Sequence, residues 1–159
     1  MIKIGVLGAG HLGKIHLKCI QDLGAYFHLA GFYDTDEQVA QKVSETLQVK
    51  AFSSIDALLE TVDCISIVTP TTTHFSLAQR AVEKGKHVFI EKPVTSNPDE
   101  SARLMDLVKK HTVVAQVGHV ERFNPAMLAV KEIALNPMFV EAHRLASFNP
   151  RGTDVPVVL

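Results

Sequence analysis

Three glycines near the amino terminus have the spacing of a phosphate-binding loop. Residues 8–13 read Gly-Ala-Gly-His-Leu-Gly, between an apolar run and a stretch with helical periodicity. In a Gly-x-Gly-x-x-Gly loop, Gly8 permits a tight turn, Gly10 leaves room for a pyrophosphate, and Gly13 lets the helix pack closely on the strand. The N–H groups at the start of the helix then face the anion. The spacing predicts a nucleotide site built mainly from backbone.

A carboxylate stands where such a site needs one. Residues 27–33 form an apolar, strand-like run that ends at Asp34, 21 positions beyond Gly13. Dinucleotide folds place the acid that bonds the adenosine ribose hydroxyls near this spacing. Thr35 and Asp36 follow, and no arginine stands nearby to receive a 2′-phosphate. We therefore expect the cofactor to be NAD rather than NADP.

Hydroxyl-bearing residues follow the third strand-like run. Residues 69–74 read Thr-Pro-Thr-Thr-Thr-His. Because ligands of open α/β sheets sit beyond the carboxyl ends of the strands, this loop should overlook the same crevice as the glycines. Its hydroxyls could bond a ribose or a diphosphate. Alternatively, Thr72 or Thr73 caps the next helix, and His74 is a packed or capping side chain.

A lysine follows the fourth strand-like run, within the sequence Glu91-Lys92-Pro93. At the lip of the crevice, partial burial can lower the pKa of a lysine towards that of a useful general acid or base. A cis Lys-Pro bond is compatible with this sequence. The alternative is an ordinary solvated loop, which the position at a strand end disfavours.

Polar residues also follow the fifth strand-like run. Gly118 allows close approach of a ligand at a strand end. His119 and Arg122 then offer a titratable group and a cation on the same side of the sheet. They could equally be residues that pack or pair between domains. His16, on the apolar face of the first helix, is expected to be a satisfied core histidine.

Alternating elements must position these groups. Helix-like runs lie between the strand-like ones and predict an α/β fold, a doubly wound parallel sheet covered on both faces. Thr35 and Gln38 are expected to form a capping box at the second helix. The expected strands are 1–4, 27–33, 64–68, 87–90 and 113–117, and the expected helices are 12–23, 35–48, 54–60, 74–83 and 98–110.

The chain is predicted to contain one complete domain and part of another. Residues 1–120 form the dinucleotide-binding domain. Residues 121–159 supply a connecting helix and a strand over 139–148, the start of a second α/β domain. About 40 residues cannot bury a core of their own, so we expect the chain to stop inside that domain.

Bulk composition excludes several classes of protein. The chain has 159 residues, 47% of them hydrophobic, and a net charge of −1. Dispersed lysines and arginines argue against nucleic acid or an anionic membrane as partner. No apolar stretch reaches 18 residues, and the first strand leaves no room for a signal peptide, so cytoplasm is expected. No metal site is predicted from the histidines, and Cys19 and Cys64 are expected to be small buried hydrophobes.

These motifs in this order resemble the Gfo/Idh/MocA family of oxidoreductases. The resemblance implies a Rossmann domain followed by an α/β domain that binds substrate and often mediates oligomers. It also implies NAD or NADP redox chemistry on sugars or their derivatives, with Lys92 in the active site. Residues 118–125 resemble members that act on nucleotide-linked amino sugars. The matching features are Gly8 to Gly13, Asp34, Thr69-Pro70 with His74, Glu91-Lys92-Pro93 and Gly118 to Pro125.

The predicted function is therefore that of the NAD-binding domain of a sugar or nucleotide-sugar dehydrogenase. Lys92 is the expected catalytic residue and His119 the expected substrate contact, in a homo-oligomeric enzyme; the 159 residues alone should be inactive. Two alternatives are a non-catalytic nucleotide-binding or sensing module and an S-adenosylmethionine-dependent methyltransferase. The residues expected at the cofactor are Gly8, Gly10, His11, Leu12, Gly13, Asp34, Thr69, Pro70, Thr71, His74, Glu91, Lys92 and Arg122.

Overall fold

The computed structural model of the chain describes residues 1–131, 133, 136–141 and 143. Packing divides the chain into two compact units, Met1–Gly118 and His119–Leu159. Within the described residues, no helix is long and apolar enough to cross a membrane.

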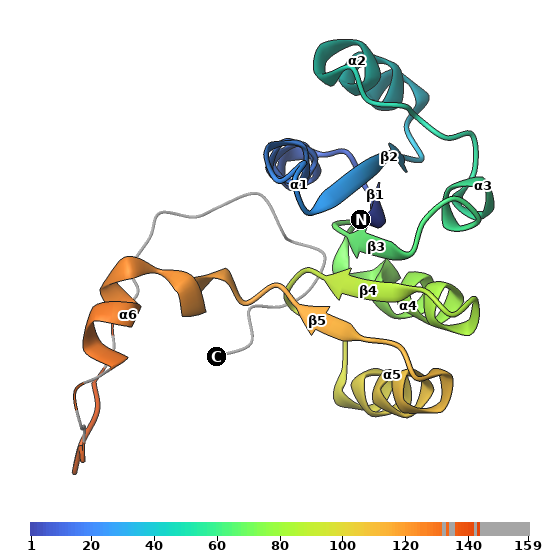
Figure 1. Cartoon of the computed structure of the whole chain (residues 1–159). Coiled ribbons are helices and arrows are strands. Elements are labelled where there is room, and N and C mark those ends of the chain that lie inside the picture. Colours follow the sequence, from blue (N-terminus) through green and yellow to red (C-terminus); the bar gives the residue numbers. More distant parts are fainter. Residues whose placement is uncertain (132, 134–135, 142, 144–159) are drawn as a thin grey trace. The chain divides into compact units, whose positions relative to one another are not determined.

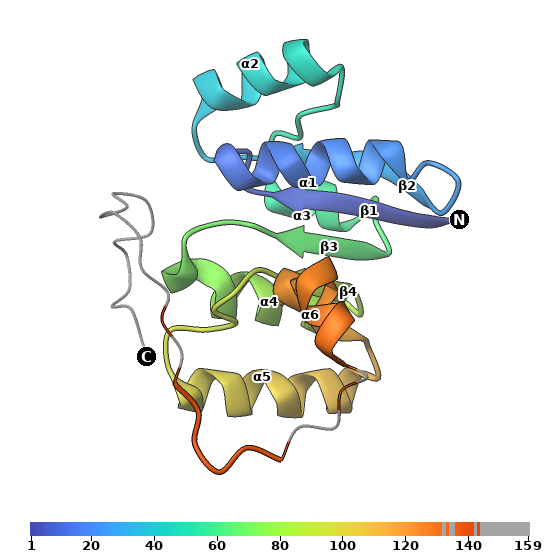
Figure 2. The same cartoon turned by 90° about the vertical axis from the view of Figure 1, so that its left-hand side faces the viewer.

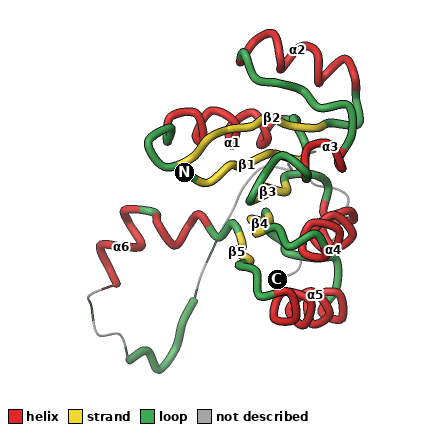
Figure 3. The backbone as a smooth tube through the Cα atoms, turned by 45° about the vertical axis from the view of Figure 1, so that its right-hand side comes forward, coloured by secondary structure: helices red, strands yellow, loops and turns green. Residues whose placement is uncertain are grey.

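The first unit is built on a parallel sheet. The strands lie in the order β2-β1-β3-β4-β5 (Figure 3). Parallel strands need long crossovers, and each crossover here carries a helix. The predicted doubly wound α/β fold is confirmed. The strands are β1 (Ile2–Leu7), β2 (Phe27–Tyr33), β3 (Cys64–Ile67), β4 (His87–Ile90) and β5 (Ala115–Val117).

A single bridge extends the sheet beyond β2. Ala51 pairs in parallel with Phe32, whose N–H donates to the carbonyl of Lys50 at 2.9 Å. If this bridge is counted as the third strand, the spatial order becomes 3-2-1-4-5-6, the order of the Rossmann fold. The strand order then reverses between β1 and β3. Ligands of such sheets bind at that reversal, beyond the carboxyl ends of the strands.

Helices cover both faces of the sheet (Figure 1). On one face α1 (His11–Asp22) and α2 (Glu37–Leu47) bury a core with β1 and β2, and α1 lies along β1 (Figure 2). On the other face lies a second core, whose fully buried residues include Leu58, Ile67 and Val82. The helices that contribute to it are α3 (Ile55–Leu59), α4 (His74–Glu83) and α5 (Pro98–His111).

Caps fix where the helices begin. The side chain of Asn97 accepts a hydrogen bond from the N–H of Glu100 at 2.9 Å and starts α5. The capping box predicted for α2 is wrong. Asp36 is the cap, and its carboxylate accepts from the N–H groups of Gln38 and Val39 at 2.9 and 3.1 Å. An ionised carboxylate is a stronger acceptor there than a threonine hydroxyl.

The inward face of α1 differs from the predicted one. Gly13, Leu17 and Ile20 are buried, whereas Cys19 is exposed. Gly13 must lie against the backbone of the glycine loop, and this contact sets the rotation of the helix about its axis. The expectation of a buried Cys19 is therefore wrong. Cys64 is partly buried in β3, and burial raises the pKa of its thiol to about 11.

The second unit contains a short helical turn, η2 (Val120–Phe123), and the helix α6 (Pro125–Lys131). The side chain of Asn124 accepts from the N–H of Ala126 at 3.0 Å, as expected of a residue that starts a helix. In the strand predicted over 139–148, the described residues 139–141 and 143 form no strand. The remaining residues of that stretch lie outside the described part of the chain.

Candidate functional site

The glycine loop, residues 8–13, joins β1 to α1 and is shaped by close backbone contacts. Gly8 has a φ of +92°, and a Cβ there would lie 2.7 Å from the carbonyl oxygen of Val68. A Cβ on Gly13 would lie 2.0 Å from the carbonyl oxygen of Gly8. Neither position can hold a side chain while the loop keeps this path.

The space in front of the loop fits a pyrophosphate. Gly10 is exposed, and a Cβ on it would meet nothing within 4 Å. Gly10 is also the N-cap of α1, and it brings no side chain to bond the N–H groups of the first turn. His11 and Leu12 in that turn are exposed, and neither side chain is an acid. These N–H groups and the positive end of the helix dipole remain available to an anion.

Asp34 follows β2 and anchors the glycine loop. One carboxylate oxygen accepts from the N–H of Ala9 at 2.6 Å, and the other accepts from the N–H of Asp36 at 2.9 Å. Each oxygen keeps a further lone pair, so the same carboxylate can accept from ribose hydroxyls. The sequence indicated the ribose contact but not this anchoring bond.

The loop after β3 forms the 3₁₀ turn η1 (Thr71–Thr73) before α4. The hydroxyl of Thr73 donates to the carbonyl of Pro70 at 2.7 Å and lies 2.8 Å from the hydroxyl of Thr69. Thr73 therefore shapes its own loop, and its side chain does not cap α4. Thr71 is buried. Thr69, Pro70 and Thr71 lie at the reversal of strand order, where a cofactor contact was predicted.

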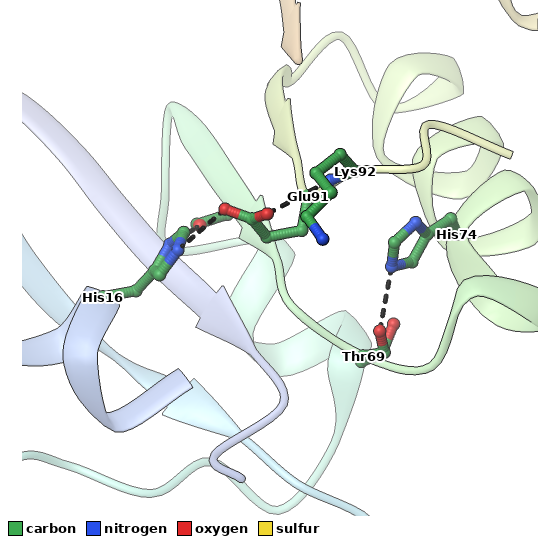
Figure 4. Close-up of polar contacts among 6 residues, drawn as sticks. His16, Thr69, His74, Glu91 and Lys92 are labelled. Atoms are coloured by element: carbon green, nitrogen blue, oxygen red, sulfur yellow. Dashed lines mark hydrogen bonds and ion pairs between the residues drawn. The ribbon is translucent and has the colours of Figure 1, made fainter. Parts of the chain in front are cut away.

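His74 joins the loop after β3 to the loop after β4. Its side chain is buried, with Nε2 2.9 Å from the carbonyl oxygen of Thr69 (Figure 4). Its Nδ1 lies 2.9 Å from the carbonyl oxygen of Pro93. This agrees with a packed histidine. The predicted role of His74 in cofactor binding stays a prediction. Its two contacts would serve that role indirectly, by holding the loops after β3 and β4 in place.

Glu91 lies buried at the end of β4 and uses both carboxylate oxygens. Oε1 lies 3.1 Å from Nε2 of His16, and Oε2 accepts from the N–H of Lys92 at 3.1 Å (Figure 4). His16 is a satisfied histidine, as expected, because its Nδ1 lies 2.9 Å from the hydroxyl of Ser66. The sequence offered one signal for this contact: His16 stands three residues after Gly13, on the same face of α1.

Lys92 is exposed at the carboxyl end of the sheet. The partial burial expected of it is therefore wrong for this structure, because residue 92 lies past the last residue of β4 and beyond the two cores. The peptide bond between Lys92 and Pro93 is cis. Figure 4 shows the lysine between Glu91 and His74.

His119 and Arg122 belong to the second unit, where both are exposed. Their predicted contacts with substrate and cofactor stay predictions. Among the described residues, no group of three histidine, cysteine, aspartate or glutamate side chains could hold a metal ion.

Fold and site together define a Rossmann dinucleotide-binding domain, with the glycine loop and the lysine at one edge of the sheet. The sequence model described as "Oxidoreductase family, NAD-binding Rossmann fold", GFO_IDH_MocA, matches residues 2–119. The chain belongs to the Gfo/Idh/MocA oxidoreductase family, as its motifs predicted.

Individual relatives agree with this family. The chain is 40% identical over 159 residues to UDP-N-acetylglucosamine 3-dehydrogenase of Acidithiobacillus ferrooxidans, matching 99% of this chain and 50% of that protein. A solved structure of that enzyme has a TM-score of 0.85 and 40% identity, over 96% of this chain and 50% of its own. The NAD(+)-dependent scyllo-inositol 2-dehydrogenase of Bacillus subtilis is 35% identical over 133 residues, 82% of this chain and 39% of its own.

The chain thus spans half, or less, of the length of these relatives. Their names are those of sugar and nucleotide-sugar dehydrogenases. They support the dehydrogenase prediction over both the sensing module and the methyltransferase.

Proposed function

We propose that this chain is the cofactor-binding part of an NAD-dependent dehydrogenase that acts on a CH–OH carbon of a nucleotide-linked sugar. The observation that carries the proposal is the exposed Lys92 at the carboxyl edge of the sheet that also bears the glycine loop. The 40% identity to a UDP-N-acetylglucosamine 3-dehydrogenase supports the substrate class.

Each part of the site has one task in this proposal. The glycine loop and the N-terminus of α1 hold the pyrophosphate, and Asp34 accepts from the adenosine ribose hydroxyls. Bound NAD supplies the hydride acceptor. Lys92 takes the proton from the substrate hydroxyl during oxidation and returns it during reduction. The loop at Thr69 to Thr71 borders the nicotinamide half.

Three further parts of the proposal concern the whole protein. Residues beyond the Rossmann domain supply the substrate pocket, in which His119 contacts the substrate and Arg122 the cofactor. The enzyme assembles from copies of this chain, and it works in the cytoplasm. Family resemblance supports the assembly, and composition supports the compartment; light scattering of the purified full-length protein tests the former.

The test is turnover of UDP-N-acetylglucosamine with NAD by the full-length protein, followed by the absorbance of NADH. Lys92→Met keeps much of the side-chain stem but removes the proton-transfer group. Its turnover should fall about 10²–10⁴-fold, the usual scale for general acid–base catalysis, while NAD affinity changes far less. Near-normal turnover of Lys92→Met would overturn the role of the lysine. scyllo-Inositol and free N-acetylglucosamine are the comparison substrates.

A further inference from the structure

A chain of polar contacts runs from β3 through α1 to Lys92. The hydroxyl of Ser66 lies 2.9 Å from Nδ1 of His16, and Nε2 of His16 lies 3.1 Å from Oε1 of Glu91. The other carboxylate oxygen accepts from the N–H of Lys92 at 3.1 Å. The side chains of His16 and Glu91 are 15% and 8% exposed. A helix that begins at the glycine loop is thereby linked to the backbone of the lysine.

The chemistry of these groups fixes the role of one ring nitrogen. An ionised carboxylate only accepts hydrogen bonds, so opposite it Nε2 of His16 is the donor. The hydroxyl of Ser66 can donate or accept, so it satisfies Nδ1 in either role. Every residue in this series of contacts has a hydrogen-bond partner, and no buried side-chain nitrogen or oxygen in the described residues lacks one. Loss of the histidine would remove the donor at Oε1 of this buried carboxylate and leave it only the N–H of Lys92 at Oε2.

Gly118 closes the other side of the carboxylate. A Cβ on Gly118 would lie 2.6 Å from Oε1 and 3.1 Å from Oε2 of Glu91. The N–H of Gly118 donates to the carbonyl of Ile90 at 2.8 Å, so this backbone is held in the sheet. The space that the sequence assigned to an approaching ligand is filled by Glu91. The ring of Phe89 packs edge-on against His16, with centroids 5.7 Å apart, and restricts the histidine as well.

We infer that His16 is a positioning residue for Lys92, acting through the Glu91 carboxylate, which lies in a slot between His16 and Gly118. Glu91 holds the peptide N–H of Lys92, while His74 contacts the carbonyl of Pro93 on the far side. The exposed lysine side chain therefore extends from a backbone fixed on both sides. The inference rests on the proposed function, because it assigns the purpose of that fixation to the reaction of Lys92.

The direct test is hydrogen exchange of the Lys92 amide in this chain. His16→Leu removes the donor to Glu91, and exchange at Lys92 should accelerate about tenfold or more, since a released carboxylate no longer holds that N–H. His16→Gln is the matched control, because its amide N–H can still reach Oε1 and should preserve slow exchange. The core amide of Val6 should be unchanged in both. Unchanged exchange at Lys92 in a folded His16→Leu chain would overturn the inference.

Gly118→Ala provides a second variant if His16→Leu does not fold. The added methyl must displace the carboxylate while leaving its charge and His16 in place, so Lys92 exchange should again accelerate. Exchange at Lys92 that stays slow in Gly118→Ala would contradict the inference, because the slot would then not be what orients Glu91.

Turnover in the full-length protein separates this inference from the proposed function. His16→Leu should lower kcat about 10- to 100-fold, the scale of a misplaced reacting group, with NAD affinity nearly unchanged. In the Lys92→Met background it should have no further effect. An equal loss in both backgrounds would overturn positioning through Lys92. Full activity of Lys92→Met would instead overturn the proposed function, whatever the amide exchange shows.

Discussion

The glycine loop, residues 8–13, and the lysine loop, residues 91–93, lie at the same edge of the sheet but are held by different means. In the glycine loop, backbone packs directly on backbone, and the carboxylate of Asp34 adds one bond to Ala9: a Cβ on Gly13 would lie 2.0 Å from a carbonyl oxygen. In the lysine loop, the backbone is held by side chains, Glu91 on one side and His74 on the other. The three atoms nearest to a Cβ on Gly118 would all belong to the carboxylate of Glu91, the end of a side chain.

This difference suggests a division of labour. The surface proposed to receive the pyrophosphate would meet the same group in the oxidised and in the reduced cofactor, and rigid backbone can form it. The proposed proton transfer requires a defined position of Lys92 relative to the substrate, and side-chain contacts can set that position independently of the glycine loop. Glycine-to-alanine changes should therefore have different consequences in the glycine loop and at Gly118, which lies against the Glu91 side chain of the lysine loop.

The largest effect is expected from Gly13→Ala. The methyl would overlap a backbone carbonyl that cannot rotate away, so the start of α1 must move off the strand. We expect a loss of about 3 kcal/mol in the free energy of unfolding, at the upper end for overpacked sites. Chemical denaturation with and without NAD measures it. A loss below about 1 kcal/mol would show that the glycine loop is as adaptable as the lysine loop.

Asp34 tests whether anchoring and cofactor choice can be separated. Like-charge repulsion between its carboxylate and a 2′-phosphate should weaken NADP relative to NAD by about 10- to 100-fold. Asp34→Asn removes the charge but keeps an oxygen for the N–H of Ala9, so the difference in affinity between NAD and NADP should narrow with little loss of NAD affinity. Asp34→Ala should narrow the same difference and also lower the affinity for NAD, because the glycine loop loses its anchor.

Calorimetric titration of both cofactors against the wild type and the two variants decides the matter. NADP binding equal to or tighter than NAD in the wild type would contradict the assigned preference. NAD affinity unchanged in Asp34→Ala would show that the bond to Ala9 does not shape the loop.

The smallest effect on stability is expected from Gly10→Ala. A Cβ there meets nothing within 4 Å, so the melting temperature of the free chain should stay the same. The methyl would occupy the space assigned to the pyrophosphate, and NAD affinity should fall about tenfold or more, equivalent to about 1.4 kcal/mol. Thermal melting with and without NAD measures both effects at once. Undiminished NAD binding would place the pyrophosphate elsewhere. A lower melting temperature of the free chain would contradict the open space beside Gly10.

Local patterns predicted most of the first unit. Residues 27–33, 74–83 and 87–90 were expected as strand, helix and strand, and β2, α4 and β4 have those bounds. Their periodicity and their stop signals are encoded within a few residues. The same holds for the glycine loop, whose function depends on the spacing of three neighbouring residues.

What the sequence could not predict depends on distances between remote segments. His16 and Glu91 are 75 positions apart, and the residues around each of them do not identify the other as its partner. The rotation of α1 follows from the contact of Gly13 with Gly8, and this rotation leaves Cys19 exposed where a buried residue was expected. The exposure of Lys92 depends on where the cores end. Such features need the assembled sheet.

The slot around Glu91 also has a consequence for how this sequence can change over generations. Four residues follow one another in contact, and a substitution at any of them leaves a mismatch in hydrogen bonding, charge or volume with the next: Ser66, His16, Glu91 and Gly118. A larger residue at 118, for example, becomes acceptable only after the carboxylate is shortened or removed. These four positions should therefore vary as a group among descendants of this sequence, although they are scattered over more than 100 residues of chain.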